Sequence, residues 1–351
     1  MVVTRADVAR MAGVSPAVVS YVLNPGSRPV SRAARERVET AVRTLGYRPN
    51  AVARALRRSS TMSIGLMVPD LANPAISAVA RGIEDIAYDL GYVLFLGTVG
   101  TDPAREERYL RTYVDRQVDA LILIGSHRPE LVTELIKNGL PILVLDRVSE
   151  GLGVSTVTPE AFESSSALVK HLIVEHGHHR IACVTGPKRR TGIAADRVAG
   201  WRHALDEAGL DSDDSMVFFG EEVTRASGHL GTGHLLDSVR PTAIFTSSDV
   251  QAVGVIGAIR ERDLLVPMDI AVVSCDASEL AERAFPGLTS AGADPMAVAR
   301  MTMDRLMEKL VPDRAAKSGG ASESAASTSP LEETHDVVPT SVTYRRSCGC
   351  N

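Results

Sequence analysis

Residues 4–16 read TRADVARMAGVSP, and they decide how the amino-terminal part of the chain folds. Thr4 belongs to the residue types that cap helices, and Asp7, three residues later, can accept a hydrogen bond from the Thr4 backbone N–H in a capping box. Gly13 supplies the backbone freedom that a tight turn needs. The stretch therefore predicts one short helix followed by a turn.

A second helix is predicted over 16–23, with Ser15 as its N-cap and Pro16 at the first helical position, where a missing N–H costs nothing. A third helix is predicted from a Ser31 cap to a stop at Gly46. Two short helices that meet at a glycine turn, followed by a longer one, are the sequence form of a helix-turn-helix.

The charge of this segment differs from that of the remaining chain. Residues 1–60 hold 11 Arg, no Lys and 3 acidic residues, a formal charge of +8, so the remainder carries −13 of the net −5. A solvated arginine-rich helix pair is the alternative interpretation. Neutralisation of DNA phosphates explains the sign and the clustering better.

An ordered series of motifs extends over about the first seventy residues. It comprises Asp7-Val8-Ala9, Ala12-Gly13-Val14-Ser15, Val19-Ser20, Val22-Leu23-Asn24, Leu45-Gly46-Tyr47-Arg48-Pro49-Asn50, Ala53-Arg54-Ala55-Leu56, Ile64-Gly65-Leu66 and Val68-Pro69-Asp70. On these motifs the chain resembles the lactose and galactose repressor family of bacterial transcription regulators. A series of this kind is far more specific than a lone helix-turn-helix.

The resemblance implies which residues of the head contact DNA. Positions that read base edges in the major groove fall on Pro16, Ala17 and Tyr21, two of which have no hydrogen-bonding side chain. Direct readout would then depend on Tyr21 and on apolar contacts with thymine methyl groups. The backbone-contacting or supporting positions are Ser15, Ser20 and Asn24, and Thr4 and Arg28 are further DNA-binding candidates.

Residues 49–57 resemble the hinge helix of the family, which folds on specific DNA and inserts a leucine at the centre of the operator. By position the wedge is Leu56, and Ala53 is small enough for two hinges to approach each other. The alternative is that Leu56 makes an ordinary interdomain contact. The DNA-contacting residues expected in the hinge are Asn50, Ala53, Arg54, Leu56 and Arg57.

From residue 61 onward, short β-branched runs alternate with helical segments. The predicted strands include 63–68, 92–96, 120–124, 142–145, 181–185, 216–219, 243–245 and 270–274, and the predicted helices include 75–90, 105–116, 160–175, 197–208 and 250–262. Nearly continuous apolar strands separated by helices predict an α/β fold with parallel sheets covered on both faces. The resemblance implies a two-lobed core like that of periplasmic binding proteins, with a cleft between the lobes.

We expect the chain to be organised in four consecutive parts, with an insertion inside the third. These are an all-α helix-turn-helix head (1–48), a hinge helix and linker (49–60), a two-lobed core (61–346), a low-complexity mobile insertion within it (313–330) and a tail (347–351). The first lobe is expected over about 61–158 and 289–311, and the second over about 159–288 and 331–346.

Ligand sites of open parallel sheets lie at the carboxyl ends of the strands, so polar residues that follow the predicted strands are the effector-binding candidates. These are Asp70, Asn73, Ser126, His127, Asp146, Arg147, Ser248, Asp249 and Asp276. The resemblance adds Arg197, in the motif Arg197-Val198-Ala199-Gly200-Trp201, and matches Asp276 to an aspartate that accepts hydrogen bonds from a sugar or a purine. Asp249 could equally be a helix N-cap, and Asp146 a turn former.

The chain departs from the family pattern around this cleft. Ala75, Ile76 and Val223 stand at or near positions where many relatives carry aromatic residues, so platforms for sugar stacking are sparse. Residues 186–196 include three successive basic residues, Lys188 to Arg190, which makes a phosphorylated or carboxylated effector a hypothesis beside a solvated basic loop. We therefore expect a small polar effector that is a sugar, a sugar phosphate or nucleobase-like.

The four cysteines agree with a reducing compartment. Cys183 and Cys275 lie in strand-like runs and are expected in the core, while Cys348 and Cys350 form a terminal Cys-Gly-Cys. Together with the histidines at 176, 178 and 179 they suggest a metal, but no spacing matches a closed zinc site, and we expect neither a metal nor a cofactor. No apolar run approaches the ~20 residues of a membrane span, so we expect a cytoplasmic, nucleoid-associated protein without membrane contact.

Together these features predict a homodimeric repressor that binds a pseudo-palindromic double-stranded DNA operator under allosteric control by a small-molecule effector. A solute-binding receptor would share the core but have no use for residues 1–57. An α/β enzyme is disfavoured because Gly151-Leu152-Gly153 and Gly231-Thr232-Gly233 lack the third glycine of a dinucleotide fingerprint, and the chain has no phosphate loop and no nucleophile elbow.

Overall fold

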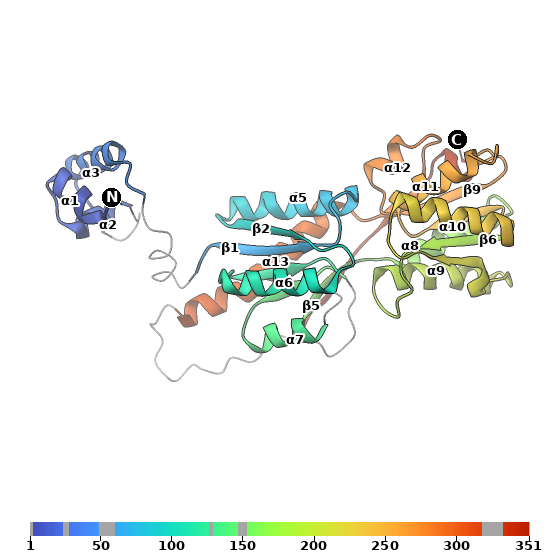
Figure 1. Ribbon diagram of the computed structural model, residues 1–351, viewed down its shortest axis with the longest axis horizontal. Coiled ribbons are helices and arrows are strands. Elements are labelled where there is room, and N and C mark those ends of the chain that lie inside the picture. The colour runs from blue at the N-terminus through green and yellow to red at the C-terminus, as the bar shows by residue number, and fades with distance from the viewer. Residues whose placement is uncertain are drawn as a thin grey trace. The chain divides into compact units, whose positions relative to one another are not determined.

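The computed structural model describes residues 3–23, 28–48, 60–125, 129–146, 153–317 and 333–350. The chain divides into two compact units, Met1–Thr61 and Met62–Asn351. The first is a small helical head, and the second is an α/β core of two lobes (Figure 1). In the part of the chain that is described, no helix has both the length and the apolar character that a membrane span requires.

The head consists of α1 (Arg5–Ala12), α2 (Pro16–Leu23) and α3 (Arg32–Leu45). The Thr4–Asp7 capping box is present, with the Thr4 backbone N–H donating to the Asp7 carboxylate at 3.0 Å. Gly13 takes a left-handed φ of 62°, and the Ser15 hydroxyl accepts from Val18 N at 3.4 Å at the start of α2. Apolar side chains from all three helices bury one another, namely Val8, Ala9, Ala12, Val19, Val22, Val38 and Ala41. The predicted helix-turn-helix is therefore the observed fold of the head.

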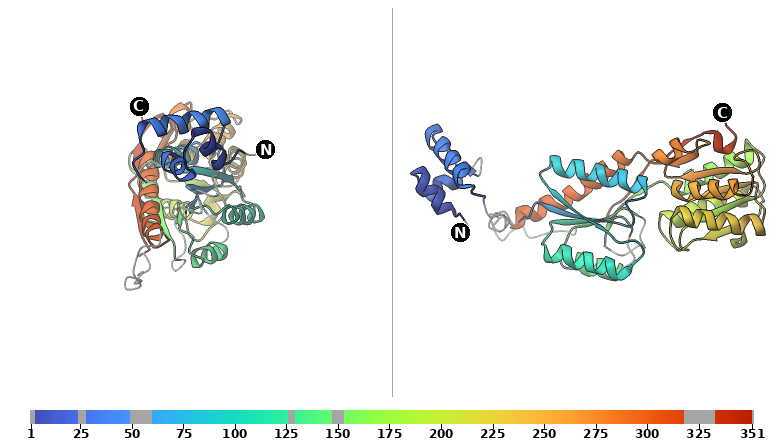
Figure 2. Two further views of the ribbon diagram at one scale, coloured as in Figure 1. Left: turned by 90° about the vertical axis from the view of Figure 1, so that its left-hand side faces the viewer. Right: turned by 45° about the horizontal axis from the view of Figure 1, so that its top comes forward.

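The first lobe is built on a six-stranded parallel sheet in the order β11-β5-β4-β3-β1-β2. Its strands are β1 (Ser63–Val68), β2 (Val93–Thr98), β3 (Ala120–Leu123), β4 (Ile142–Val144), β5 (Ser155–Pro159) and β11 (His335–Val338). Helices α5 (Pro74–Asp89) and α13 (Pro295–Lys317) pack on one face, and α6 (Pro103–Asp115) and α7 (Pro129–Lys137) pack on the other (Figure 2). Side chains alternate between these two layers along β1, as the period of a strand requires.

The second lobe repeats this architecture with a sheet in the order β12-β10-β9-β8-β6-β7. Its strands are β6 (Ile181–Thr185), β7 (Val217–Phe219), β8 (Ala243–Thr246), β9 (Ala271–Cys275), β10 (Thr289–Gly292) and β12 (Ser341–Thr343), of which only β12 pairs antiparallel. Helices α8 (Phe162–Val174) and α9 (Ile193–Glu207) cover one face, and α10 (Arg225–Ser238) and α11 (Asp249–Arg260) cover the other. The short helices α12 (Glu279–Arg283), η1 (Asp214–Met216) and η2 (Arg346–Cys348) complete it.

The chain passes between the lobes three times, after β5, after β10 and between β11 and β12. Two predicted lobe boundaries are wrong. Residues 289–292 form β10 of the second lobe, whereas they were expected in the first. Residues 331–346 do not belong to one lobe, because β11 pairs with β5 in the first lobe and β12 pairs with β10 in the second. Two strands, one in each lobe, therefore occupy a segment that was expected in the second lobe alone.

The low-complexity stretch begins later than expected. Helix α13 continues to Lys317, so 313–317 are helical, as the two alanines at 315 and 316 favour. Residues 318–330 lie outside the described residues. At the other end, the expected tail at 347–351 starts with two buried residues, since Ser347 is fully buried and Cys348 is 1% exposed in the second lobe.

Candidate functional site

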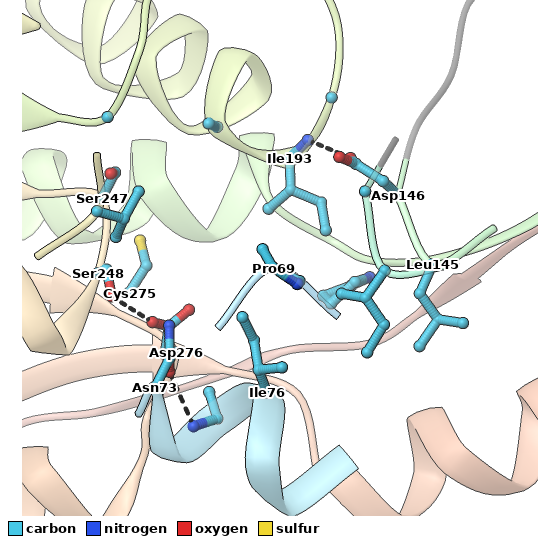
Figure 3. A pocket seen from close by; sticks show the side chains of 18 of the residues that line it. Pro69, Asn73, Ile76, Leu145, Asp146, Ile193, Ser247, Ser248, Cys275 and Asp276 are labelled. Atoms are coloured by element: carbon cyan, nitrogen blue, oxygen red, sulfur yellow. Dashed lines mark hydrogen bonds between the residues drawn. The ribbon is translucent and has the colours of Figure 1, made fainter. Parts of the chain in front are cut away.

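A cleft of about 520 Å³ lies between the two lobes of the core, where the carboxyl ends of their parallel strands meet (Figure 3). Its lining residues from the first lobe include Asp70, Asn73, Ile76, Thr98 and Asp146, and those from the second include Arg189, Arg197, Val223, Ser248 and Asp276. A cavity of this volume is in the range of small-molecule sites in proteins.

The polar centre of the second-lobe wall is formed by Arg197 and Asp276, whose side chains are only 14% and 10% exposed. Arg197 Nη2 lies 2.9 Å from Asp276 Oδ1, and Arg197 Nη1 donates to the Ser247 carbonyl at 2.6 Å. The Ser248 hydroxyl donates to Asp276 Oδ2 at 2.7 Å. Burial lowers the pKa of Arg197, but the Asp276 carboxylate more than compensates, so that the net pKa of the guanidinium is raised. The pair is therefore a fixed donor and acceptor at the cleft.

The backbone under Asp276 is strained. Asp276 and Ala277 have φ angles of 108° and 49°, which non-glycine residues seldom adopt. The conformation is held because Asp276 N donates to the Ala291 carbonyl at 2.8 Å, and Ala277 N to the Ser290 hydroxyl at 2.9 Å. A Cβ on Gly292 would lie 2.3 Å from the Asp276 carbonyl oxygen, so glycine is required there. Such strain is typical of functional positions.

Asp249 does not line the cleft, so the prediction that it contacts the effector is wrong. It is fully buried behind the wall, where it accepts hydrogen bonds from the hydroxyls of Ser274, Ser278 and Ser290 and from Ser278 N. Burial raises the pKa of Asp249, and the Asp276 carboxylate adds to this, while the hydroxyl donors act in the opposite direction. The N-cap of α11 is Ser248 and not Asp249. Through its hydrogen bonds Asp249 instead joins β9, the start of α12 and β10, the three segments behind this wall of the cleft.

Asp146 joins the two lobes. Its Oδ1 accepts a hydrogen bond of 2.7 Å from the backbone N–H of Ile193, the first residue of α9 in the second lobe. The positive end of the helix dipole favours a carboxylate at this place. A Cβ on Gly192, whose φ is 103°, would lie 3.1 Å from the same oxygen. Asp146 is therefore an interlobe contact rather than only a turn former.

Two of the remaining effector candidates accept hydrogen bonds from nearby backbone N–H groups. Asp70 Oδ1 accepts from Ala72 N at 2.8 Å, and Asn73 caps α5 by accepting from Ala75 N at 3.0 Å, and both line the cleft. Ser126, His127 and Arg147 lie outside the described residues.

Several lining residues were missed by the sequence analysis, chiefly Thr98, Arg105, Glu160 and Ser164. Thr98 ends β2, so the strand-end rule would have found it had it been applied to this strand as well. Glu160 accepts from Glu163 N and Ser164 N at 2.7 and 2.8 Å and thereby caps α8 at a crossing point. No sequence signal shows that a helix cap faces the cleft.

Much of the remaining cleft wall is aliphatic. Ile76, Val79, Leu145, Ile193 and Val223 contribute to it, and no aromatic side chain occurs among the lining residues in the described ranges. The one lining thiol, Cys275, has its pKa raised to about 11 by burial, so it is a poor nucleophile. This arrangement can hold a compact polar ligand by hydrogen bonds and aliphatic contacts.

The predicted DNA-contacting residues that the structure describes lie on α2 and its N-cap, at the N-cap of α1 and in the segment after α2. Ser15, Pro16 and Ala17 are exposed at the start of α2, and Ser20 and Tyr21 are half-buried. The Arg28 guanidinium lies 5.9 Å from the centre of the Tyr21 ring. Thr4 is the exposed cap of α1. Asn24 and the hinge residues Asn50, Ala53, Arg54, Leu56 and Arg57 lie outside the described residues.

Both units match known protein families. Residues 4–50 match the family of bacterial regulatory proteins called the lacI family, and residues 169–348 match a periplasmic binding protein-like domain. The chain is 33% identical over 306 residues to the HTH-type transcriptional repressor PurR of Aliivibrio salmonicida (strain LFI1238), covering 87% of this chain and 91% of that protein.

Two further similarities cover nearly the same length. The ribose operon repressor of Escherichia coli (strain K12) is 33% identical over 309 residues, covering 88% of this chain and 93% of that protein. A solved structure of the Lac repressor dimer bound to operator and the anti-inducer ONPF superposes with a TM-score of 0.82 at 27% identity, covering 99% of both chains. These relatives are transcriptional repressors, so the chain is a transcriptional regulator and not an enzyme. It belongs to the lacI family of bacterial regulatory proteins.

Proposed function

We propose that this protein represses transcription by binding a pseudo-palindromic DNA operator as a homodimer, and that a small polar molecule in the interlobe cleft controls this binding. The observation that carries the proposal is the presence, in one chain, of an exposed reading helix and a two-lobed core with a polar cleft. The Lac repressor structure, described as a dimer bound to operator, supports the two-fold arrangement.

The DNA-binding part of the proposal assigns base reading to Pro16, Ala17 and Tyr21 on α2. Exposure of the first two at the amino end of the helix suits contact with a major groove. Thr4, Ser15, Ser20, Asn24 and Arg28 would contact or support contacts with the backbone. Residues 49–57 would fold as the hinge on the operator, with Leu56 between base pairs and Asn50, Ala53, Arg54 and Arg57 beside it.

Effector binding is proposed to act through the closure of the lobes. The Asp146–Ile193 hydrogen bond and the Glu160 cap with its Thr340 contact of 3.3 Å both lie at the cleft, where the lobes meet. A ligand that contacts Asp70 and Asn73 on one side and Arg197, Ser248 and Asp276 on the other stabilises the closed arrangement. Regulation follows if the closed and open forms differ in their affinity for DNA.

The effector class that we propose is a sugar, a sugar phosphate or a nucleobase-like compound. Arg197 and Asp276 offer a donor and an acceptor side by side, which suits vicinal hydroxyls or the edge of a base. Of the three basic residues at 188–190, only Arg189 lines the cleft, and Lys188 is paired with Asp214 at 2.6 Å. This geometry favours a neutral effector over a strongly anionic one.

Titration calorimetry tests this with matched pairs of free and phosphorylated sugars and with purine bases. Saturable binding of a neutral member that Asp276→Asn abolishes supports the proposed class. Binding restricted to phosphorylated compounds would contradict the preference for neutral ligands, while the cleft would still be the proposed effector site.

We infer that the protein works in the bacterial cytoplasm and on the nucleoid, where its operator is. A solute-binding receptor is the alternative that shares this core. A gel-shift assay with the upstream region of its own gene separates the two, because a receptor would bind no DNA fragment selectively.

A further inference from the structure

Four potential metal ligands gather in the second lobe, outside the residues that line the cleft. They are His171 in the last turn of α8, His176 just after this helix, and Cys348 and Cys350 at the carboxyl end. One ligand atom from each residue lies within 4.8 Å of all the others. The sequence gives no zinc spacing here, because positions 176 and 348 are distant along the chain and only the fold brings them together.

Four of the six distances between the ligand atoms are close to those of a tetrahedral zinc site, and the other two, from Cys348 Sγ to Cys350 Sγ and to His176, are within 4.8 Å. With Zn–N bonds of about 2.05 Å and Zn–S bonds of about 2.3 Å, a tetrahedron places two nitrogens about 3.3 Å apart and a nitrogen and a sulfur about 3.6 Å apart. The two histidine Nε2 atoms are 3.1 Å apart. Cys350 Sγ lies 3.4 Å and 3.5 Å from Nε2 of His171 and His176, and Cys348 Sγ lies 3.5 Å from that of His171.

A hydrogen bond between two neutral imidazoles accounts for the short separation of the histidines, and thiols can donate to imidazole nitrogen. His171 Nε2, however, has three such neighbours, His176 and both cysteines, and a neutral ring nitrogen has only one lone pair or one hydrogen to offer. A divalent cation bound by two thiolates and two neutral imidazoles has no net charge, which suits a half-buried position. The residue types and the charge balance thus agree with the distances.

The local structure holds the ligands in place. Gly349 lies between the two cysteines with a φ of 108°, and a Cβ there would lie 3.1 Å from the His176 ring, so only glycine lets both cysteines face the histidines. The Thr289 hydroxyl lies 3.0 Å from Cys348 Sγ and can donate to its thiolate. The Tyr344 ring packs against His171 with ring centres 4.3 Å apart. Outer contacts of this kind orient metal ligands.

We propose that His171, His176, Cys348 and Cys350 form a structural zinc site that fastens the carboxyl end of the chain to α8. All four positions of the tetrahedron are filled by protein, so the ion has no open place for a substrate and its role is to stabilise the second lobe. Because the ion binds the folded chain, its removal lowers the melting temperature.

Metal analysis of the full-length protein, purified under reducing conditions without chelator, tests the site directly. One zinc per chain is expected. After removal of the metal, titration with Co²⁺ should give the visible bands of a tetrahedral cobalt site and a thiolate-to-cobalt charge-transfer band in the near ultraviolet, both saturating at one equivalent. Absence of both zinc and the charge-transfer band overturns the proposal.

Variants locate the site. Cys350→Ser and His176→Gln should each lose the charge-transfer band at one equivalent or weaken cobalt binding by at least tenfold. His234→Gln, which changes an exposed histidine outside the cluster, should bind like the wild type. Chelator should lower the melting temperature of the wild type and of His234→Gln, with little effect on the two cluster variants. Equal metal binding by all four proteins contradicts the assignment.

A disulfide between Cys348 and Cys350 is the competing state. Counting thiols in the unfolded protein under non-reducing conditions separates the two possibilities. Four reactive thiols accompanied by one zinc support the metal site, whereas two thiols in a metal-free protein that binds cobalt only weakly after reduction overturn it.

Discussion

The Asp146 carboxylate of the first lobe accepts a hydrogen bond of 2.7 Å from the backbone N–H of Ile193 in the second lobe. Asp146 therefore caps α9 from across the cleft, which joins the two halves of the core at the place where an effector would bind. A side chain that belongs to one lobe and completes a helix of the other is sensitive to any change in their separation.

Asp146→Ala removes this interlobe contact and should favour the open arrangement of the lobes. A helix cap with charge complementarity contributes about 1 kcal/mol, so effector affinity should fall about fivefold. Calorimetry measures the loss. Asp102→Ala is the control, since Asp102 caps α6 within its own lobe and does not line the cleft. An unchanged effector affinity for Asp146→Ala would show that the contact plays no part in closure.

Asp276→Asn should abolish effector binding while the protein remains folded. The change leaves Arg197, which is mostly buried, without its anionic partner and removes an acceptor from the cleft. Loss of one member of such a charge pair costs about 2–5 kcal/mol, which corresponds to a 30-fold or larger decrease in affinity. The exposed Asp213→Asn is the control. Wild-type affinity in Asp276→Asn would exclude this carboxylate from the site.

The buried Asp249 predicts a particular dependence of stability on pH. Burial raises its pKa in the folded protein above the ordinary value of about 4, with Asp276 adding to the effect. The folded state then holds its proton more tightly than the unfolded state does. The stability that Asp249 contributes is full below pH ~4 and is lost as the pH rises through the raised pKa of the folded state.

Thermal unfolding of the wild type and of Asp249→Asn across this range measures the effect. Because the asparagine cannot ionise, the melting temperature of the wild type relative to the variant should fall as the pH rises above about 4. A difference that stays constant would mean that the hydroxyl donors of Ser274, Ser278 and Ser290 offset burial, and one that grows with pH would mean that they outweigh it.

Leu56→Ala tests the proposed hinge. If Leu56 enters the base stack at the operator centre, the variant should lose at least ~10-fold in affinity for the operator and little for random DNA. Leu56→Met, which keeps an aliphatic side chain of similar volume, should retain most of the specific affinity. Equal losses on both kinds of DNA would indicate that Leu56 makes an ordinary interdomain contact.

The elements that sequence alone predicts correctly are those that local chemistry determines. The Thr4–Asp7 capping box, the Gly13 turn and the Ser15 cap act within a few residues, and the structure contains all three. The apolar central strands β1, β3, β4, β6, β8 and β9 are equally visible because each is buried along its whole length. These features suffice for the fold class.

The features that could not be predicted from the sequence depend on contacts between residues that are distant along the chain. Residues 335–343 form two short strands on either side of Pro339, and their division between the lobes follows from pairing with β5 and β10, which are distant in sequence. Asp249 and Asp276 both follow strands, yet one is buried among hydroxyls and the other lines the cleft. The approach of Cys348 and Cys350 to two histidines has the same origin.

Binding of the full-length protein to the upstream region of its own gene, with and without candidate effectors, tests the central claim most directly. We expect a saturable complex at physiological salt that specific competitor DNA displaces far better than random DNA, and whose affinity changes when a ligand of the cleft is added. Failure to bind any such fragment selectively, even at low salt and with every ligand that the cleft accepts, would contradict the account.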